Sequence, residues 1–275
     1  MHFLLIEDPL DSRLDAFRNV PDAELVRRRG IFVAEGRLVV RRLMTDSALV
    51  TRSVMLTDTA REAMTDLLDL RPEVPAFVVP QAVMDSVAGF HIHRGCLAIG
   101  EYPQPRPWQD IVANARMLLV LERIANPDNV GGIFRSAAAF GADAVLLDPA
   151  TTDPLYRKAI RTSMGAALVV PFARIEKWPA ALVELRALGF AVVATTPEPS
   201  KPALSAIASG LANRRVALVL GHEGDGLSDQ ALASCEFHAR IPVTSNVDSL
   251  NVATAAAIAL YECGRDSCRN SSGRE

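Results

Sequence analysis

The C-terminal part of the chain holds a run that is apolar on almost every side of a helix. Residues 241–262 read IPVTSNVDSLNVATAAAIALYE, and alanine fills five positions between 253 and 259. A helix without a polar face is buried, and its small side chains let a neighbouring backbone approach closely. Pro242 has no N–H for a sheet ladder, so a strand ends there. The run therefore predicts a strand end, a polar loop and a buried helix from residue 250.

The loop before this helix carries polar candidates. Ser249 stands one step before the apolar run, where an N-cap residue is expected, and Asn251 follows it. The free N–H groups and the positive dipole end of the helix point into the same loop. We expect a pocket with fixed donors here, and an ordinary loop in a packed core is the alternative.

Composition narrows the class of protein. The chain has 275 residues, enough for one large or two medium domains, and 49% of them are hydrophobic. No apolar run reaches the length of a membrane span, and the N-terminus MHFLLIEDPLD turns acidic too early for a signal peptide. The four cysteines form no C-x-x-C pair. We expect a soluble cytoplasmic protein with no disulfide or zinc framework and no membrane association.

Charge restricts how the chain can bind nucleic acid. The net charge is −3 and the isoelectric point is near 6.0, so RNA binding has to use a local patch. A solvated helix face is the default explanation for the densest positive cluster, but arginine also favours bidentate phosphate contacts. The cluster comprises Arg27, Arg28, Arg29, Arg37, Arg41 and Arg42.

The motif FHIHRG contains two histidines, His91 and His93. They could ligate a metal, but no carboxylate or cysteine lies at a suitable spacing. An alternating strand edge is the better interpretation, and we expect no metal.

The chain divides into two predicted domains. Residues 1–102 alternate short β-like and helical runs, which predicts a small α/β domain. Its strands are expected at 31–33, 50–56, 76–79 and 96–102, and its helices at 23–29, 37–44, 59–70 and 81–87. Prolines at 103, 105 and 107 stiffen a linker over residues 103–107. Residues 108–263 repeat the alternation with continuously apolar strands, which predicts a parallel sheet covered by helices on both faces. The polar tail, residues 264–275, is expected to be disordered. Strands of the second domain are expected at 117–121, 144–147, 167–170, 190–195, 216–220 and 237–241.

Ligands of such sheets bind outside the carboxyl ends of the strands, where two further loops are unusual. In ERIANPDNVGGIFRSAAAFGA, residues 122–142, Asn129 can cap a helix and Gly131 and Gly132 permit close backbone approach. Arg135 lies on the same helix and needs a partner there: a carboxylate, a carbonyl or a bound phosphate. A buried structural ion pair is the alternative.

The second loop reads LVLGHEGDGLSD, residues 218–229. Its glycines allow tight turns, but their spacing fits neither G-x-G-x-x-G nor a P-loop. A phosphate-cradling nucleotide loop is therefore disfavoured, and Glu223 is interpreted as an acceptor held in a glycine turn.

Together, NVGGIFR, LVLGHEGDGL and IPV…SLNVATAAAIALYE resemble, in order and spacing, the three motifs of the SpoU (TrmH-type) RNA 2′-O-ribose methyltransferases of the SPOUT class. The stretch DPLYRKAIRTSMGAAL resembles the family's intermediate segment. FVAEGRLVV more weakly resembles the small α/β RNA-binding domain often fused in front. The chain departs from the family where Ser245 replaces a common glycine and Val243 a common methionine; Ser245 has fewer allowed backbone angles than glycine, so the loop geometry can differ.

The resemblance implies a parallel-sheet domain with a C-terminal trefoil knot, a homodimer, S-adenosylmethionine as cofactor, and structured ribosomal or transfer RNA as substrate. It implies catalytic roles for Asn129, Arg135, Glu223, Ser249 and Asn251. It places the cofactor around Thr195, Gly221, Ile241 and Leu250. The expected RNA contacts are Arg28, Arg29, Arg41, Arg135 and Arg161.

Chemistry agrees with these roles, because methyl transfer from a sulfonium is an in-line displacement that needs a positioned, partly deprotonated ribose hydroxyl. Arg135 is the cation of the three motifs and is expected to stabilise the developing oxyanion. It is not a simple general base, because a guanidinium stays protonated.

Two other functions are considered. A non-catalytic RNA-binding protein is disfavoured because Arg135 and Asn251 are present. A nucleotide-dependent oxidoreductase is disfavoured because the dinucleotide-binding fingerprint is missing.

Overall fold

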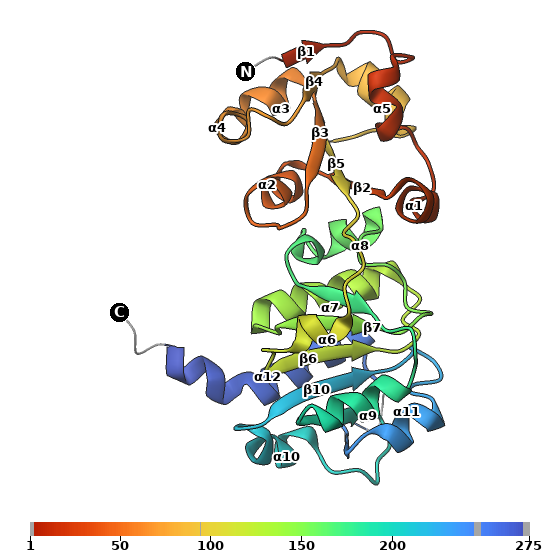
Figure 1. Cartoon of the computed structure of the whole chain (residues 1–275), viewed down its shortest axis with the longest axis vertical. Coiled ribbons are helices and arrows are strands. Elements are labelled where there is room, and N and C mark those ends of the chain that lie inside the picture. The colour runs from red at the N-terminus through yellow and green to blue at the C-terminus, as the bar shows by residue number, and fades with distance from the viewer. Residues whose placement is uncertain (1–2, 94, 245–248, 272–275) are drawn as a thin grey trace. The chain divides into compact units, whose positions relative to one another are not determined.

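The computed structural model describes residues 3–93, 95–244 and 249–271, with side chains as far as residue 264. Contacts divide the chain into two compact units (Figure 1). The first unit contains Met1–Gln104 and the segment Pro154–Val169, and the second contains Pro105–Asp153 and Val170–Glu275. Within the described residues, no helix is both long and apolar enough to cross a membrane.

The first unit is built on a mixed five-stranded sheet. Strands β1 (Phe3–Leu5), β4 (Ala76–Val78) and β3 (Thr51–Leu56) run parallel, and β5 (Cys96–Glu101) runs antiparallel to β3 and to β2 (Ile31–Glu35). The strands predicted after residue 31 are present, whereas β1 was not predicted. The helix expected over residues 59–70 is broken into two short helices. The helices are η1 (Ser12–Phe17), α1 (Asp22–Glu24), η2 (Leu25–Arg29), α2 (Arg37–Thr45), α3 (Asp58–Glu62), α4 (Thr65–Leu70) and α5 (Gln81–Ala88).

The segment Pro154–Val169 belongs to the first unit, although the sequence analysis placed it in the second domain. It forms α8 (Arg157–Thr162) and the 3-10 turn η3 (Ala166–Leu168), so the strand expected over 167–170 is wrong. Gly165, with φ near +80°, supplies the left-handed residue between them. The backbone N–H of Arg157 donates to the Asp22 carboxylate at 3.0 Å, and Arg42 donates to the Met164 carbonyl at 3.2 Å. These contacts explain why the segment Pro154–Val169 belongs to the first unit.

The second unit is the predicted parallel sheet with helices on both faces. Its six strands follow the order β11 (Phe237–Ala239), β9 (Phe190–Thr195), β10 (Arg215–Leu220), β6 (Met117–Leu121), β7 (Ala144–Leu147) and β8 (Phe172–Arg174), and every pairing is parallel. Helices α6 (Trp108–Val112), α9 (Ala180–Ala187) and α11 (Asp229–Ser234) cover one face. Helices α7 (Pro127–Phe140), α10 (Leu204–Leu211) and α12 (Val252–Ser271) make the layer on the other face.

Helices α7 and α12 pack in parallel and in register. A Cβ added to Gly132 would lie 2.8 Å from the Cβ of Ala253, and the rings of Phe140 and Tyr261 are 6.0 Å apart. Eight positions separate the two contacts on each helix, so the helices run in the same direction. The predicted close approach at Gly132 is confirmed.

The last helix differs from its prediction in three respects. It begins at Val252 instead of residue 250, and it continues to Ser271, so the polar segment expected to be disordered after residue 264 is helical to that point. It is also not buried on all sides. Val252, Ala256 and Leu260 are buried, but Tyr261 is 52% exposed, so one face stays open to solvent.

The buried cysteines have no role in a disulfide. Burial raises the pKa of the Cys96 and Cys235 thiols to about 12 and that of Cys263 to about 11. Because the thiolate is the reactive form, these three thiols should resist alkylation at neutral pH in the folded protein and react after unfolding. Mass-spectrometric mapping of iodoacetamide adducts measures this, and rapid native labelling of Cys96 would contradict the packing described.

Candidate functional site

The predicted cofactor-binding residues gather at one edge of the second unit's sheet. Thr195 ends β9, and its hydroxyl donates to the Val219 carbonyl of β10 at 2.9 Å. Gly221 directly follows β10, and Ile241 lies two residues after β11. Because these three strands are parallel neighbours, their carboxyl ends share one edge. Leu250 precedes α12, which begins at the same edge.

The loop after β10 is a tight turn that only glycine can start. His222 and Gly226 exchange backbone hydrogen bonds of 3.1 and 3.0 Å. A Cβ at Gly221 would lie 2.4 Å from backbone atoms of Gly226 and Leu227, far inside contact distance. The His222 Nδ1 accepts from the N–H groups of Gly224 and Asp225 at 3.0 and 3.2 Å. His222, which the sequence analysis did not single out, thus shapes the turn by accepting two backbone N–H groups at Nδ1.

A second residue missed from sequence, Glu122, anchors the far end of this turn. Its side chain follows β6 and is 2% exposed. The carboxylate accepts from the N–H and the hydroxyl of Ser228 at 2.8 and 2.6 Å and from the Trp178 indole at 2.7 Å. Ser228 caps α11, so Glu122 ties the turn to the neighbouring strand end. A charged residue ending an apolar strand was the available sequence signal.

Three of the predicted catalytic residues form one hydrogen-bonded chain. The Asn129 amide donates to Glu223 Oε1 at 2.6 Å, and the Asn251 amide donates to Asn129 Oδ1 at 2.8 Å. Asn251 Oδ1 in turn accepts from the N–H groups of Ala253 and Thr254 at 2.9 and 3.3 Å. These hydrogen bonds fix the orientation of each side-chain amide. They also join the three segments that carry the motifs.

The helix caps differ from the sequence expectation. Asn126 caps α7 by accepting from the Asp128 N–H at 2.9 Å, while Asn129 lies inside the first turn and is 8% exposed. Asn251 caps α12 in place of Ser249. Ser249 is exposed, and its hydroxyl bonds to none of the described residues. The reason is register: α12 begins two residues later than its apolar pattern suggests.

This geometry brings two helix N-termini together. The register of α7 and α12 places their first turns next to each other, and Glu223 lies against Asn129 in the first of them. Both positive dipole ends therefore favour negative charge at this edge. The site can hold an anionic group or stabilise a developing one.

Arg135 stands apart from this chain. It follows Asn129 by six positions on α7, about 9 Å along the helix axis. Its side chain is exposed and pairs with none of the described residues, so the alternative of a buried structural ion pair is wrong. Ser245, where the chain departs from the family pattern, lies outside the described residues.

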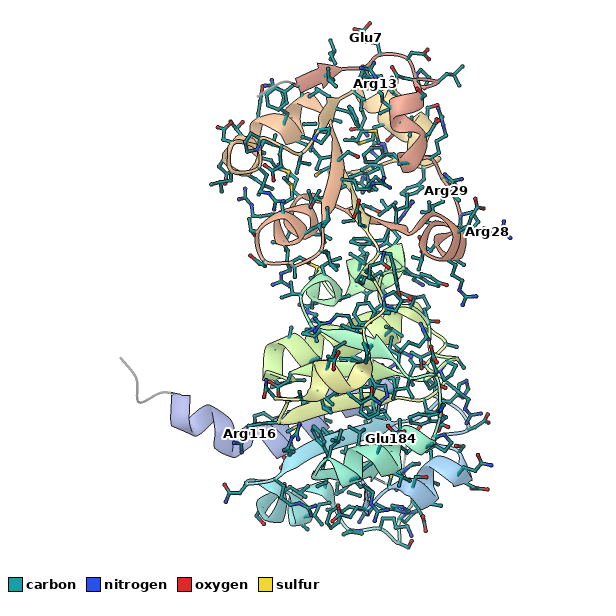
Figure 2. The ribbon with its side chains drawn as sticks, in the orientation of Figure 1. Glu7, Arg13, Arg28, Arg29, Arg116 and Glu184 are labelled. Atoms are coloured by element: carbon teal, nitrogen blue, oxygen red, sulfur yellow. The ribbon has the colours of Figure 1, made fainter. Side chains whose placement is uncertain are left out.

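The remaining predicted RNA contacts, Arg28, Arg29, Arg41 and Arg161, all lie in the first unit. Figure 2 shows Arg28 and Arg29 projecting outward beside α1. Arg29 pairs with Glu24 at 3.1 Å, Arg41 donates twice to Asp66 at 2.7 and 2.9 Å, and Arg161 lies 4.0 Å from Glu35. The pairs of Arg29 and Arg41 are exposed and contribute little stability, so they do not prevent exchange for a phosphate.

The histidine motif is a turn and not a strand edge. His91 Nδ1 lies 2.7 Å from the Asp85 carboxylate, and the His91 and His93 rings meet edge to face at 4.7 Å. The sequence analysis missed Asp85 because the partner sits on the preceding helix. Within the residues described, no cluster of three or more histidine, cysteine or acidic side chains could hold a metal.

Comparison with known proteins agrees with this arrangement. Residues 116–261 match the SpoU rRNA Methylase family. An uncharacterised tRNA/rRNA methyltransferase of Mycobacterium tuberculosis is 40% identical over 260 residues, covering 93% of this chain and 89% of the relative. The 23S rRNA (guanosine(2553)-2′-O)-methyltransferase RlmP of Bacillus subtilis is 25% identical over 93% of this chain and 97% of that protein.

Solved structures give the same result. The AdoMet-bound rRNA methyltransferase of Sinorhizobium meliloti superposes with a TM-score of 0.80 at 26% identity, over 96% of this chain and 98% of that one. Fold, ordered motifs and relatives agree, and the chain belongs to the SpoU family of tRNA/rRNA methyltransferases.

Proposed function

We propose that this protein transfers a methyl group from S-adenosylmethionine to a ribose 2′-hydroxyl of ribosomal or transfer RNA. The observation that carries the proposal is the Glu223–Asn129–Asn251 chain, which links three loops at the carboxyl ends of parallel strands. The RlmP relative is a 2′-O-methyltransferase by name, and the Sinorhizobium structure holds AdoMet. Both support the proposal for this chain.

The described residues fit the cofactor. The Gly221 turn leaves backbone groups free of a side chain at the sheet edge, and Ile241 and Leu250, both partly exposed, provide apolar surface. Thr195 is fixed by its bond to Val219. These residues would hold the cofactor, which supplies an electrophilic methyl on sulfur.

The protein's own residues position the RNA and stabilise the charge that develops during transfer. Arg135, exposed and unpaired among the described side chains, holds the RNA backbone and stabilises charge developing on the ribose oxygen. Glu223, Asn129 and Asn251 keep the loops in their mutual geometry, and the exposed Ser249 hydroxyl is available to orient the ribose. The adjoining helix N-termini add a field that favours the oxyanion.

The arginines of the first unit supply RNA affinity in this proposal. Arg28, Arg29, Arg41 and Arg161 come from three separate segments of the first unit, α8 included. A net charge of −3 makes such a local patch necessary for binding a polyanion.

The glycine turn gives a matched test of the cofactor site. We expect Gly221→Ala to abolish S-adenosylmethionine binding, because the new Cβ would force backbone at Gly226 and Leu227 to move. Gly224→Ala is the control, since its Cβ would meet only the His222 ring at 3.5 Å. Calorimetry in the presence of a chelator measures both variants. Equal cofactor affinity for the two variants would contradict the site, and loss of wild-type binding on chelation would contradict a metal-free reaction.

Arg135 gives a test of the reaction. Arg135→Ala should lower methyl transfer by on the order of 10²-fold, the scale of one lost oxyanion donor, while cofactor binding stays intact. Arg116→Ala is the control, because Arg116 is exposed and lies at the opposite end of β6 (Figure 2). Transfer of a tritiated methyl group to RNA, followed by nuclease mapping of ribose methylation, reports the result. Full transfer by the Arg135 variant would show the mechanism to be wrong.

We also propose that the C-terminal segment forms the family's trefoil knot and that the protein is a homodimer. The partly open face of α12 supports the dimer, because Tyr261 and the adjoining alanines offer apolar surface to a second copy.

Sedimentation of the protein should report a mass of twice 29.6 kDa. Tyr261→Asp should shift the protein toward the monomer, whereas Leu188→Asp, at a 44% exposed leucine after α9, should not. A monomeric, active wild type would refute the dimer.

A further inference from the structure

The first unit contains a cavity that the proposed reaction does not use. Its volume is about 380 Å³, within the range of about 300–1,000 Å³ typical of small-molecule sites. Thr57 and Asp58 line it directly after β3, and Gln81 lines it after β4. Because β3 and β4 are parallel, the cavity lies at their carboxyl ends, where open α/β sheets bind ligands.

One wall of the cavity carries a cation without a partner. Arg37 is exposed, and its guanidinium forms no hydrogen bond or ion pair with any described residue. Arg27 and Arg28 are likewise exposed and unpaired among the described residues, whereas Arg41 is held by Asp66 and Arg13 by Asp11. Arg37 is also the first residue of the nine-residue helix α2, whose first turn has no acidic side chain. A cation at the positive end of a helix is unfavourable by itself, so this position attracts an anion strongly.

The lining of the cavity also contains acceptors. Asp58 is exposed, with Arg61 3.4 Å away as its neighbour on the helix. Both N–H groups of the Gln81 amide are occupied, one by Asp85 at 2.7 Å and the other by the Ile92 carbonyl at 3.2 Å. Its carbonyl oxygen therefore remains an acceptor for a ligand. A carboxylate and a carbonyl repel a second phosphate but suit the amino groups at the edge of a nucleobase.

An imidazole completes the lining. His93 is exposed, and its ring meets His91 edge to face, while His91 is anchored by Asp85. A fixed ring at the rim can stack on an unstacked base, which is how proteins read single-stranded nucleotides of RNA. The histidine motif, which the methyltransferase site leaves without a role, acquires one here.

We propose that this cavity binds one unstacked nucleotide of the substrate RNA, with its base inside against Asp58 and Gln81 and its phosphate on Arg37. The inference rests on the proposed RNA substrate and adds a second recognition point, in the first unit, to the catalytic site in the second. It ties RNA choice to a nucleotide that is not itself methylated.

Two variants of the full-length protein test the two halves of the proposal. Arg37→Gln removes the phosphate contact and should weaken RNA binding about tenfold and lower the slope of log K against log salt by about one. Thr59→Trp fills the cavity from an exposed position and should weaken binding by about fivefold or more with an unchanged slope, because a stacked base is lost and the phosphate contact is kept. Arg13→Gln, an equal change of charge elsewhere in the unit (Figure 2), is the control.

The probe is fragmented, deproteinised ribosomal and transfer RNA, measured by filter binding at several salt concentrations. Cofactor binding by each variant reports that the second unit is intact. As an independent measurement, 4-thiouridine-substituted RNA should crosslink to peptides that line the cavity in the wild-type protein. Crosslinks confined to the second unit would refute the proposal.

The outcomes separate this inference from the proposed function. If wild-type protein binds and methylates RNA while Arg37→Gln or Thr59→Trp behaves like Arg13→Gln, the nucleotide site is wrong and the methyltransferase proposal stands. If wild-type protein neither binds nor methylates RNA, the proposed function fails and this inference fails with it.

Discussion

The candidate site depends on how closely α7 and α12 approach. Gly132 has no side chain at the point where Ala253 meets it, so the two helices can lie in register from their first turns to the Phe140–Tyr261 contact. This register lets the amide of Asn251 reach Asn129, and Asn129 reach Glu223. A larger residue at position 132 would push the helices apart and break a chain of short hydrogen bonds before it disturbed the sheet. The Gly132–Ala253 contact therefore sets both the packing of the two helices and the geometry of the hydrogen-bonded chain.

Parallel packing also explains the electrostatic character of the site. Two antiparallel helices would place one positive and one negative end at the sheet edge, and their fields would oppose each other there. Here both positive ends meet beside a carboxylate that is fixed by an amide donor. Arg135 adds a full charge about 1.7 turns beyond Asn129 on α7, and its side chain has no partner among the described residues. The edge is organised around negative charge that a substrate brings or that a reaction generates.

The boundaries of the two units determine which truncations leave a unit intact. The segment Pro154–Val169 leaves the second unit's chain and packs into the first, with Ala159, Ile160 and Leu168 buried there. Removing residues 1–102 would expose this apolar face, so a simple truncation does not isolate the methyltransferase unit. The same arrangement brings Arg161 into the unit that holds Arg28, Arg29 and Arg41. Four of the five expected RNA-contact arginines, contributed by distant parts of the sequence, thus lie in one unit.

The sequence by itself determined the parallel sheet, most strand positions and the three loops, because apolar periodicity and glycine placement are local properties. It also singled out Asn129, Glu223 and Asn251, which the structure joins in one hydrogen-bonded chain. Tertiary structure decided which of them touch, which residue caps α12, and that Ser249 and Arg135 lie outside the hydrogen-bonded chain. It also decided that Glu122 binds Ser228 and the Trp178 indole, that His222 accepts from loop N–H groups, and that Pro154–Val169 belongs to the first unit. These depend on contacts between residues far apart in the chain, and no local pattern encodes the distance between two helices.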